Sequence, residues 1–449
     1  MHCEFKGLLG ESGVPGSLSK SRSWVQIPYG SPILLLISSV AERRAHNANV
    51  EGSIPSSATI LRGSVVEHQS LISSGTSATL ATATILTPLK TSMPKNTGVD
   101  SDTSAIPLPQ RSPMQRILFI TKKGQKYSEE YGYTHCSSGL KNSARFVVDM
   151  LRANGVDAKL VDVIDNNDID REVFKFKPDI VIIEALWVIP EKFSILKKLH
   201  PKVKWVVRIH SEVPFLATEG IAIKWIIEYL RKNVFVAFNS LRAQFEFMEL
   251  TKSDKIIYLP NFFPTHDVKK NKKRTSDHIL NVGCFGAIRP MKNQLMQALA
   301  AIRYAELHDK FLVFHINASR VEQNGEPVLE NIRALFKYTP NTFLVEHSWL
   351  NQKNFHDLLQ TMDLNMCVSL SETFCIVAAE SVALNVPLVC SEEVHWANKI
   401  SKADPTSMNS IVNRIEAVLN NKMYANFINK YNLNKYDKKS INTWLQFVK

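Results

Sequence analysis

The stretch LNMCVSLSETFCIVAAESVALNVPLVCS, residues 364–391, contains a complete strand–helix–strand unit. Its two ends, from Leu364 and from Val386 onward, are short apolar runs typical of buried strands, and the segment between them has the length of one helix. Strands that alternate with helices in this way predict a parallel sheet covered on both faces.

The same alternation continues toward the N-terminus as far as Met114. The part nearer the quoted unit has a helix at 293–307 and apolar strands at ILNVGCFGAI (279–288), FLVFHIN (311–317) and NTFLVEHSW (341–349). Another set of strands precedes it, at RILFIT (116–121), residues 156–163, PDIVIIEAL (178–186), KWVVRIH (204–210) and NVFVAFNS (233–240). A helix between the first two of these has Gly155 in the position of a C-cap.

We therefore expect an α/β fold with two doubly wound, Rossmann-like domains and a ligand site in the cleft between them. The expected segments are an N-terminal extension (1–113), a first Rossmann-like domain on the acceptor side (114–266), a basic linker (267–277), a second Rossmann-like domain (278–430) and a C-terminal helix (431–449) that packs across the domain junction. The linker is read as a solvated connection, with a phosphate-binding strip as the alternative.

Residues 1–113 contain 20 serines and no lasting apolar period, which is typical of a disordered segment. An alternative is that they are a mis-annotated translation. VQIP (25–28), VAER (40–43) and GSIP (52–55) resemble translated transfer-RNA genes, in which case synthesis would begin at Met93 or Met114. Such gene clusters occur beside coding genes in large bacteriophages, so this alternative would favour a bacteriophage origin.

Composition excludes some classes of protein. The longest apolar run, Ile33 to Val40, is far shorter than the ~20 residues that a membrane span needs. The six cysteines form no CxxC pair, which favours a reducing compartment, the cytoplasm, or the host cytoplasm if the protein is viral. The net charge of +12 is compatible with nucleic acid, an anionic membrane surface or a phosphorylated substrate, and it selects none of them.

Arg289 and Lys292 lie just after a strand and just before a helix. Two cations beside a helix N-terminus predict a site for an anion, particularly a diphosphate. Gly283 and Gly286 would let the backbone approach such a ligand closely. The alternative is two solvated loop cations.

Glu372 and Glu380 are eight residues apart, one in the loop after a strand and one inside the following helix. Glu380 stands among small apolar residues, where a carboxylate needs a hydrogen-bonding partner such as a ribose diol. Glu372 would point into the cleft, and the amides of Thr373–Ile376 would hold a sugar hydroxyl or a phosphate at the helix N-terminus. The alternative is one helix-dipole glutamate and one exposed glutamate.

These two segments, about 80 residues apart, resemble the retaining GT-B glycosyltransferases of family 4. ETFCIVAAESVALNVPLV (372–389) matches the frame of the family motif EGFGxxxxEAMAxGxPVI. Residues 138–163 are similar to the glycine loop and first helix–strand unit of that family, and LPNFFP (259–264) resembles its hinge.

The resemblance implies a role for each matching residue. Arg289 and Lys292 would neutralise the donor diphosphate, Glu380 would bind the nucleotide ribose, and Glu372 the donor sugar. Further donor contacts would come from Gly286, Thr373, Phe374, Cys375 and Ile376. Gly139 would line the first-domain loop, and His210 would contact the donor sugar. The family needs no metal.

Three positions depart from the family pattern. Thr373 and Cys375 replace both glycines of EGFG, and Ala287 stands where the family has its arginine. Arg289 lies two residues later and would point the same way if the strand continued that far.

The resemblance therefore implies sugar transfer from a nucleoside diphosphate sugar, a UDP-sugar by preference, to an acceptor hydroxyl with retention of configuration. The leaving phosphate would act as the base in a front-face attack, and no cofactor is expected because the nucleotide sugar is a co-substrate. The acceptor is not determined: a polysaccharide, a lipid-linked sugar and a modified DNA base are the three alternatives. Peripheral association of the protein with an anionic membrane or with DNA is a further expectation. The alternatives are a GT-B UDP-sugar epimerase and a non-catalytic nucleotide- or DNA-binding protein.

Overall fold

The computed structural model describes residues 115–123, 127–128, 132–133, 138–265 and 277–449, all of which belong to one compact unit, Thr103–Lys449. The predictions for the extension (1–113) and for residues 267–276 of the basic linker lie outside the described residues.

The first half forms a six-stranded parallel sheet in the order β4-β1-β5-β6-β7-β8. Its strands are β1 (Arg116–Lys122), β4 (Asp157–Val163), β5 (Ile180–Glu184), β6 (Lys204–Ile209), β7 (Phe235–Phe238) and β8 (Ile256–Tyr258). Its helices are α2 (Ser138–Ala153), α3 (Asp168–Phe176), α4 (Pro190–Leu199), α5 (Val213–Leu216), α6 (Ala222–Arg231) and α7 (Leu241–Thr251). A short antiparallel pair, β2 (Tyr127–Ser128) and β3 (Gly132–Tyr133), lies between β1 and α2.

Alternate side chains of the strands enter two different hydrophobic cores, as a doubly wound sheet requires. Ile117 and Phe119 of β1 pack on the face covered by α2, whereas Leu118 and Ile120 pack on the face covered by α3, α4, α6 and α7. Helix α2 ends before Gly155, whose φ of 81° lies in the left-handed region that favours glycine, so the predicted C-cap is confirmed.

The second half forms another six-stranded parallel sheet, in the order β11-β10-β9-β12-β13-β14. Its strands are β9 (Ile279–Cys284), β10 (Phe311–Ile316), β11 (Thr342–Glu346), β12 (Leu364–Cys367), β13 (Leu388–Ser391) and β14 (Lys402–Ala403). The helices are α8 (Gln294–Leu307), α9 (Glu326–Tyr338), α10 (Gln352–Leu359), α11 (Ile376–Ala383) and α12 (Met408–Asn420), with the 3-10 turns η1 (Pro290–Lys292) and η2 (Lys399–Ser401). Helices α8, α9 and α12 share one core with this sheet, and α11 packs in a separate cluster with β13.

Each sheet has one point at which the strand order reverses. In the first sheet it lies between β1 and β5, and in the second between β9 and β12. Ligands of doubly wound proteins bind at the carboxyl ends of the strands beside this switch point. In the second sheet those ends are Cys284 and Cys367. The segments that follow them contain Lys292 and Glu372, which the sequence predicts as ligand-binding residues.

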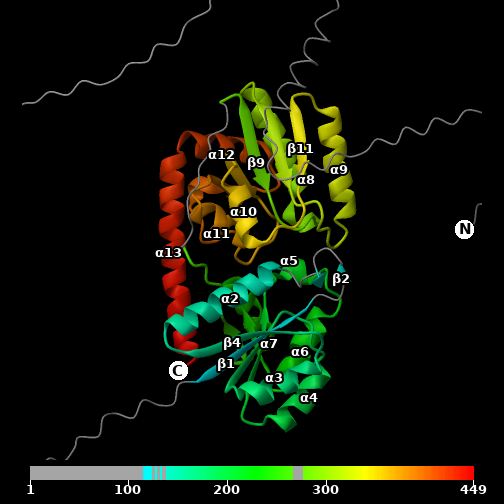
Figure 1. The fold of residues 1–449 in the computed structure, drawn as a ribbon, viewed down its shortest axis with the longest axis vertical. Helices are drawn as coiled ribbons and strands as arrows, with labels where there is room; N and C mark the ends of the chain where they lie inside the picture. The colour runs from blue at the N-terminus through cyan, green and yellow to red at the C-terminus, as the bar shows by residue number, and fades with distance from the viewer. Residues whose placement is uncertain (1–114, 124–126, 129–131, 134–137, 266–276) are drawn as a thin grey trace, which may run out of the picture. The chain divides into compact units, whose positions relative to one another are not determined.

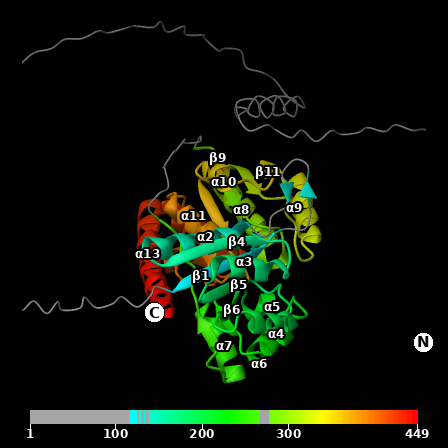
Figure 2. The same cartoon turned by 60° about the horizontal axis from the view of Figure 1, so that its bottom comes forward.

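The last helix, α13 (Lys422–Phe447), contacts elements of both halves (Figures 1 and 2). Asn429 bonds to Ser401 of the second half, whereas the Trp444 ring is buried among side chains of β1 and α2. The Trp444 indole also donates to the carbonyl of Pro260 at 2.9 Å. The prediction that a C-terminal helix packs across the junction is confirmed, but the helix begins at Lys422 rather than at residue 431.

Helix α13 also binds the connection between the halves through Asp437, which accepts a hydrogen bond from the Phe263 amide at 3.1 Å. Burial raises the pKa of Asp437 to about 7, against a backbone hydrogen bond that lowers it.

This raised pKa predicts a pH-dependent stability. The pKa of Asp437 is about 7 in the folded chain and 3.8 in the unfolded chain, so the folded chain binds the proton more tightly. The free energy of unfolding should therefore fall by about 1.4 kcal/mol per pH unit as pH rises between about 4 and 7. Asp437→Asn should remove this contribution, so that the variant is more stable than the parent above pH 7 and the difference disappears below pH 4. Urea unfolding at pH 4, 5.5 and 8 measures this, and an unchanged difference across that range would contradict it.

No helix in the described part of the chain combines the length and the apolar character needed to cross a membrane.

Candidate active site

Lys292 and Glu372 form an ion pair at the switch point of the second sheet. Lys292 ends η1 immediately before α8, and Glu372 lies in the loop between β12 and α11. The Lys292 ammonium donates to Glu372 Oε1, which also accepts from the Ser369 hydroxyl at 2.8 Å. The sequence predicted both residues as ligand-binding groups, and the structure brings them together.

Both members of this pair are ionised at neutral pH. Burial acts to lower the pKa of Lys292, but the charge of Glu372, its hydrogen bond and the nearby Cys375 together raise that pKa. Burial likewise acts to raise the pKa of Glu372, and the Lys292 charge and hydrogen bond hold it below its ordinary value. The site therefore holds a fixed cation and a fixed anion at the carboxyl ends of β9 and β12.

A small cavity of about 10 Å³ lies against the pair, which is about the space that one water molecule needs. Its walls include three cysteines, Cys284, Cys367 and Cys375. Burial raises the pKa of Cys284 to about 12, so this thiol stays protonated at neutral pH.

Arg289 does not join this pair as a second free cation. Strand β9 ends at Cys284, and Arg289 precedes η1, so the strand does not continue to it as the sequence interpretation required. The guanidinium lies 4.6 Å from the ring centre of Phe215, and Nη1 is 3.4 Å from Glu322 Oε2. Arg289 is thus engaged by a carboxylate and by an aromatic ring of the first half.

Glu380 is buried inside α11, 4% exposed, as expected of a carboxylate among small apolar residues. Its Oε1 lies 3.0 Å from Nε2 of His356 on α10. His356 is therefore the hydrogen-bonding partner that the Glu380 carboxylate needs in this structure. The binding of a ribose by Glu380 stays a prediction.

The loop from Thr373 to Ile376 leads into α11. Phe374 is buried, and its carbonyl accepts from the Trp396 indole at 2.8 Å. Cys375 precedes the helix with φ = 61°, in the left-handed region where a side chain other than glycine is strained. The resemblance places a glycine here, and the cysteine adopts the backbone conformation that glycine favours. Ile376 is the first residue of α11.

Two predicted glycines have different surroundings. Gly286 has φ = 123°, and its amide donates to Asn317 Oδ1 at 3.0 Å, so a special backbone conformation is required there. Gly139 is the second residue of α2 rather than part of the preceding loop, and a Cβ there would meet no atom within 4 Å.

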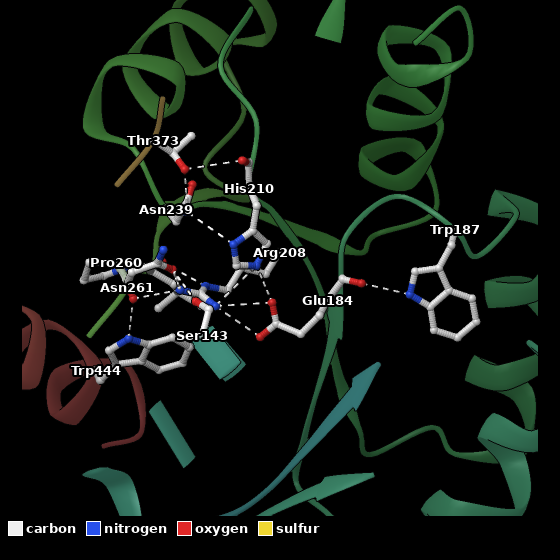
Figure 3. A network of polar contacts seen from close by, with 11 residues as sticks. Ser143, Glu184, Trp187, Arg208, His210, Asn239, Pro260, Asn261, Thr373 and Trp444 are labelled. Atoms are coloured by element: carbon white, nitrogen blue, oxygen red, sulfur yellow. Dashed lines mark hydrogen bonds and ion pairs between the residues drawn. The ribbon is translucent and has the colours of Figure 1, made fainter. Parts of the chain in front are cut away.

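The first sheet has a buried polar network at the carboxyl ends of its strands, drawn in Figure 3. Glu184 ends β5, and Arg208 lies on β6; both side chains are fully buried. Arg208 Nη1 donates to both Glu184 oxygens at 3.1 and 3.2 Å. Its other nitrogens donate to the carbonyls of Leu259 and Pro260 and to Asn261 Oδ1, at 3.0, 2.9 and 2.6 Å.

His210 follows β6 directly, as predicted, and its ring belongs to the same network. Nε2 contacts Glu184, and Nδ1 lies 3.2 Å from Asn239 Nδ2. Burial, with the nearby Arg208 charge, lowers the pKa of His210, so the ring is neutral at pH 7. We assign the proton to Nε2, because an ionised carboxylate requires a donor there.

The two halves meet at Thr373. Its hydroxyl donates to the His210 carbonyl at 3.3 Å and accepts from Asn239 Nδ2 at 3.0 Å. Nearby, Arg242 of α7 forms a two-point ion pair with Glu393, at 2.6 and 3.0 Å. The loop that carries Glu372 is therefore bonded directly to the His210 region.

Sequence reasoning missed Glu184, Arg208, Asn239 and Asn261. A signal was present, because each is a single polar residue at or just after the end of an apolar run, where parallel strands place their ligand-binding groups.

Among the described residues, no group of three or more histidines, cysteines, aspartates or glutamates is arranged to hold a metal ion.

Two six-stranded doubly wound sheets in tandem, each with its switch point at the ends described above, define the GT-B fold. No protein-family model matches the sequence, and no curated protein matches it.

Solved structures of the same fold do match. One is sucrose-phosphate synthase from Thermosynechococcus elongatus (TM-score 0.53, 11% identity, 74% of this chain and 98% of that one). A second is a trehalose-6-phosphate structure from E. coli bound with UDP-2-fluoro glucose (0.55, 12%, 74% and 99%). A third is a trehalose-6-phosphate synthase from work on enzymatic glycosyltransfer with retention (0.54, 12%, 74% and 99%). At these identities the likeness concerns the fold.

Proposed function

We propose that this protein is a glycosyltransferase that takes a sugar from a nucleoside diphosphate sugar, with UDP-sugars as the first choice, and joins it to an acceptor hydroxyl with retention of configuration. The observation that carries the proposal is the partly buried Lys292–Glu372 ion pair at the switch point of the second sheet. The GT-B fold supports it, as do similar structures described by bound UDP-2-fluoro glucose and by glycosyltransfer with retention.

Lys292 supplies the charge that the departing diphosphate needs. Lys292 precedes the first residue of α8 by two positions, and its side chain lines the same cavity as Gln294 at the start of that helix, so a phosphate placed there would meet a fixed cation and the positive end of a helix. Such charges stabilise a transition state when they are already in place before the reaction. Glu372 and Glu380 then accept hydrogen bonds from hydroxyls of the donor, Glu372 from its sugar and Glu380 from its ribose.

Retention is assigned to front-face attack, in which the departing phosphate takes the proton of the acceptor hydroxyl. Cys284 lines the cavity beside the pair, and its thiol is protonated and therefore a weak nucleophile, which favours this route over a covalent intermediate on that thiol. The reaction as proposed requires no bound metal. Polysaccharide, lipid-linked sugar and modified DNA base remain the acceptor classes, and each offers a hydroxyl.

The test is nucleotide release by the full chain from panels of UDP-, GDP- and ADP-sugars, each with and without the three classes of acceptor. We expect one donor to be consumed, with UDP as the product, and Glu380→Ala to weaken binding of that donor. Calorimetric titration with each donor and free nucleotide accompanies the panel. A folded chain that binds no nucleotide sugar would contradict the proposal, and conversion of a donor without an acceptor would indicate an epimerase.

A further inference from the structure

Asn239 carries an unused hydrogen-bond acceptor at the place where the two halves meet. It follows β7, and its side chain is completely buried. Its Nδ2 donates to His210 Nδ1 at 3.2 Å and to Thr373 Oγ1 at 3.0 Å. Its Oδ1 is buried and has no hydrogen-bond partner within the described chain.

The orientation of the Asn239 amide follows from its neighbours. Glu184 is ionised: burial acts to raise its pKa, but the charges and hydrogen bonds of Arg208 and His210 together lower it. His210 must therefore donate to Glu184 through Nε2. Nδ1 of the neutral ring is then a lone pair that needs a donor, which only the amide nitrogen of Asn239 supplies in this contact. If the amide were turned over, Oδ1 would face Nδ1 of His210, and two acceptors would be in contact without a proton between them. Oδ1 is therefore the atom left without a partner.

A buried acceptor without a donor costs stability, and such atoms in folded proteins call for a reason. The missing partner must be a donor, which excludes carboxylates and phosphates. A neutral hydroxyl has the chemistry that this position lacks.

The location connects this atom to the donor sugar. Thr373, to which the Asn239 amide is bonded, directly follows Glu372 in the sequence. A sugar bound by Glu372 would therefore lie beside the loop that contacts Asn239. Because Oδ1 is covered in this structure, a hydroxyl can reach it only after a neighbouring group moves, and the Thr373 loop touches the same amide.

We propose that Asn239 determines specificity for the donor sugar, with Oδ1 accepting a hydrogen bond from one of its hydroxyls. The inference rests on the proposed function and names an additional contact for its substrate. Nδ2 donates to Nδ1 of His210 and so stabilises the tautomer protonated at Nε2, while Oδ1 accepts from the sugar hydroxyl. One amide thus links the orientation of the His210 ring to donor recognition.

The experiment pairs hydroxyl deletions on the donor with a deletion on the protein. Calorimetry measures binding of the active nucleotide sugar and of its monodeoxy analogues to the full chain and to Asn239→Ala. We expect loss of one particular hydroxyl to weaken binding to the parent chain about tenfold, as a hydrogen bond of ordinary strength implies, and to change binding to the variant less than twofold. Asn331→Ala, on the exposed side of α9, is the matched control and should keep the parental tenfold loss.

Two results would overturn the inference while the proposed function stands. One is a parent chain that turns over its donor but whose binding weakens less than twofold for every monodeoxy analogue. This result needs no variant, so it tests the inference even if Asn239→Ala does not fold. The other is equal losses in parent and variant for every analogue. If the folded parent binds no nucleotide sugar at all, the proposed function fails first, and this inference fails with it.

Discussion

Lys292→Ala is expected to reduce sugar transfer by about 100- to 1,000-fold, the range seen when one group that stabilises a transition-state charge is removed. The departing diphosphate would lose the ammonium that stands at the start of α8. Steady-state nucleotide release from the active donor measures this, and the loss should fall on kcat as well as on kcat/KM, because the developing charge exists only in the transition state.

The same substitution leaves Glu372 buried without its cation, so the fold must be controlled separately. Its pKa should then rise above that of the parent, since burial is no longer opposed by the Lys292 charge. The double variant Lys292→Ala/Glu372→Gln removes the unpaired charge and should regain stability but not activity. Lys175→Ala, an exposed lysine on α3, serves as the matched control and should retain parental turnover. A folded Lys292→Ala chain with more than a third of parental kcat would contradict the role proposed for Lys292.

Arg208→Met is expected to lower the free energy of unfolding by about 3–5 kcal/mol, because it leaves the Glu184 carboxylate buried without its cation. The carbonyls of Leu259 and Pro260 and the amide of Asn261 lose a donor at the same time. Urea unfolding at pH 7 measures the change, which is a large fraction of the roughly 5–15 kcal/mol by which a typical domain is stable.

The companion variant tests the cause. Arg208→Met/Glu184→Leu removes both charges and should recover part of the loss, as replacement of buried ion pairs by apolar side chains often does. Arg303→Ala, which breaks an exposed pair on α8, should change stability by less than about 0.5 kcal/mol. Equal losses for the single and double variants would show that the unpaired carboxylate is not the cause. The pair also has a pH dependence: the folded pKa of Glu184 is lowered, so its contribution is complete above the ordinary value of 4.5 and is lost as pH falls through the lower folded value.

The sequence predicted the sheets well because their strands are continuous apolar runs. RILFIT and PDIVIIEAL became β1 and β5, which are buried along almost their whole length. The strands β8 and β14 were missed because they have three and two residues, too few to show a period. The start of α13 was placed too late since its apolar residues are spread around the helix, with Ala425 and Leu433 buried among polar neighbours.

The candidate site was predicted in part. The structure has Lys292 and Glu372 in loops between a strand and a helix, as the motif spacing indicates, but spacing cannot show which charges pair. The sequence therefore gave no sign that Arg289 faces Glu322 or that Glu380 faces His356, since those partners come from other elements. The Glu184–Arg208–His210 network depends on the register of β5 beside β6, which places Glu184 opposite Arg208.

Helix α13 has a consequence for how the chain is made. The Trp444 indole completes the core of the first sheet and bonds to Pro260, which precedes it by 184 positions. At a synthesis rate of about 5–20 residues per second, the first sheet emerges from the ribosome roughly 10–40 s before the side chain that finishes its core. During that interval the faces of β1 and α2 that will receive Trp444 are uncovered, and they are candidates for chaperone binding. Loss of the last ten residues, far from the start of the chain, would leave the first sheet permanently in this unfinished state.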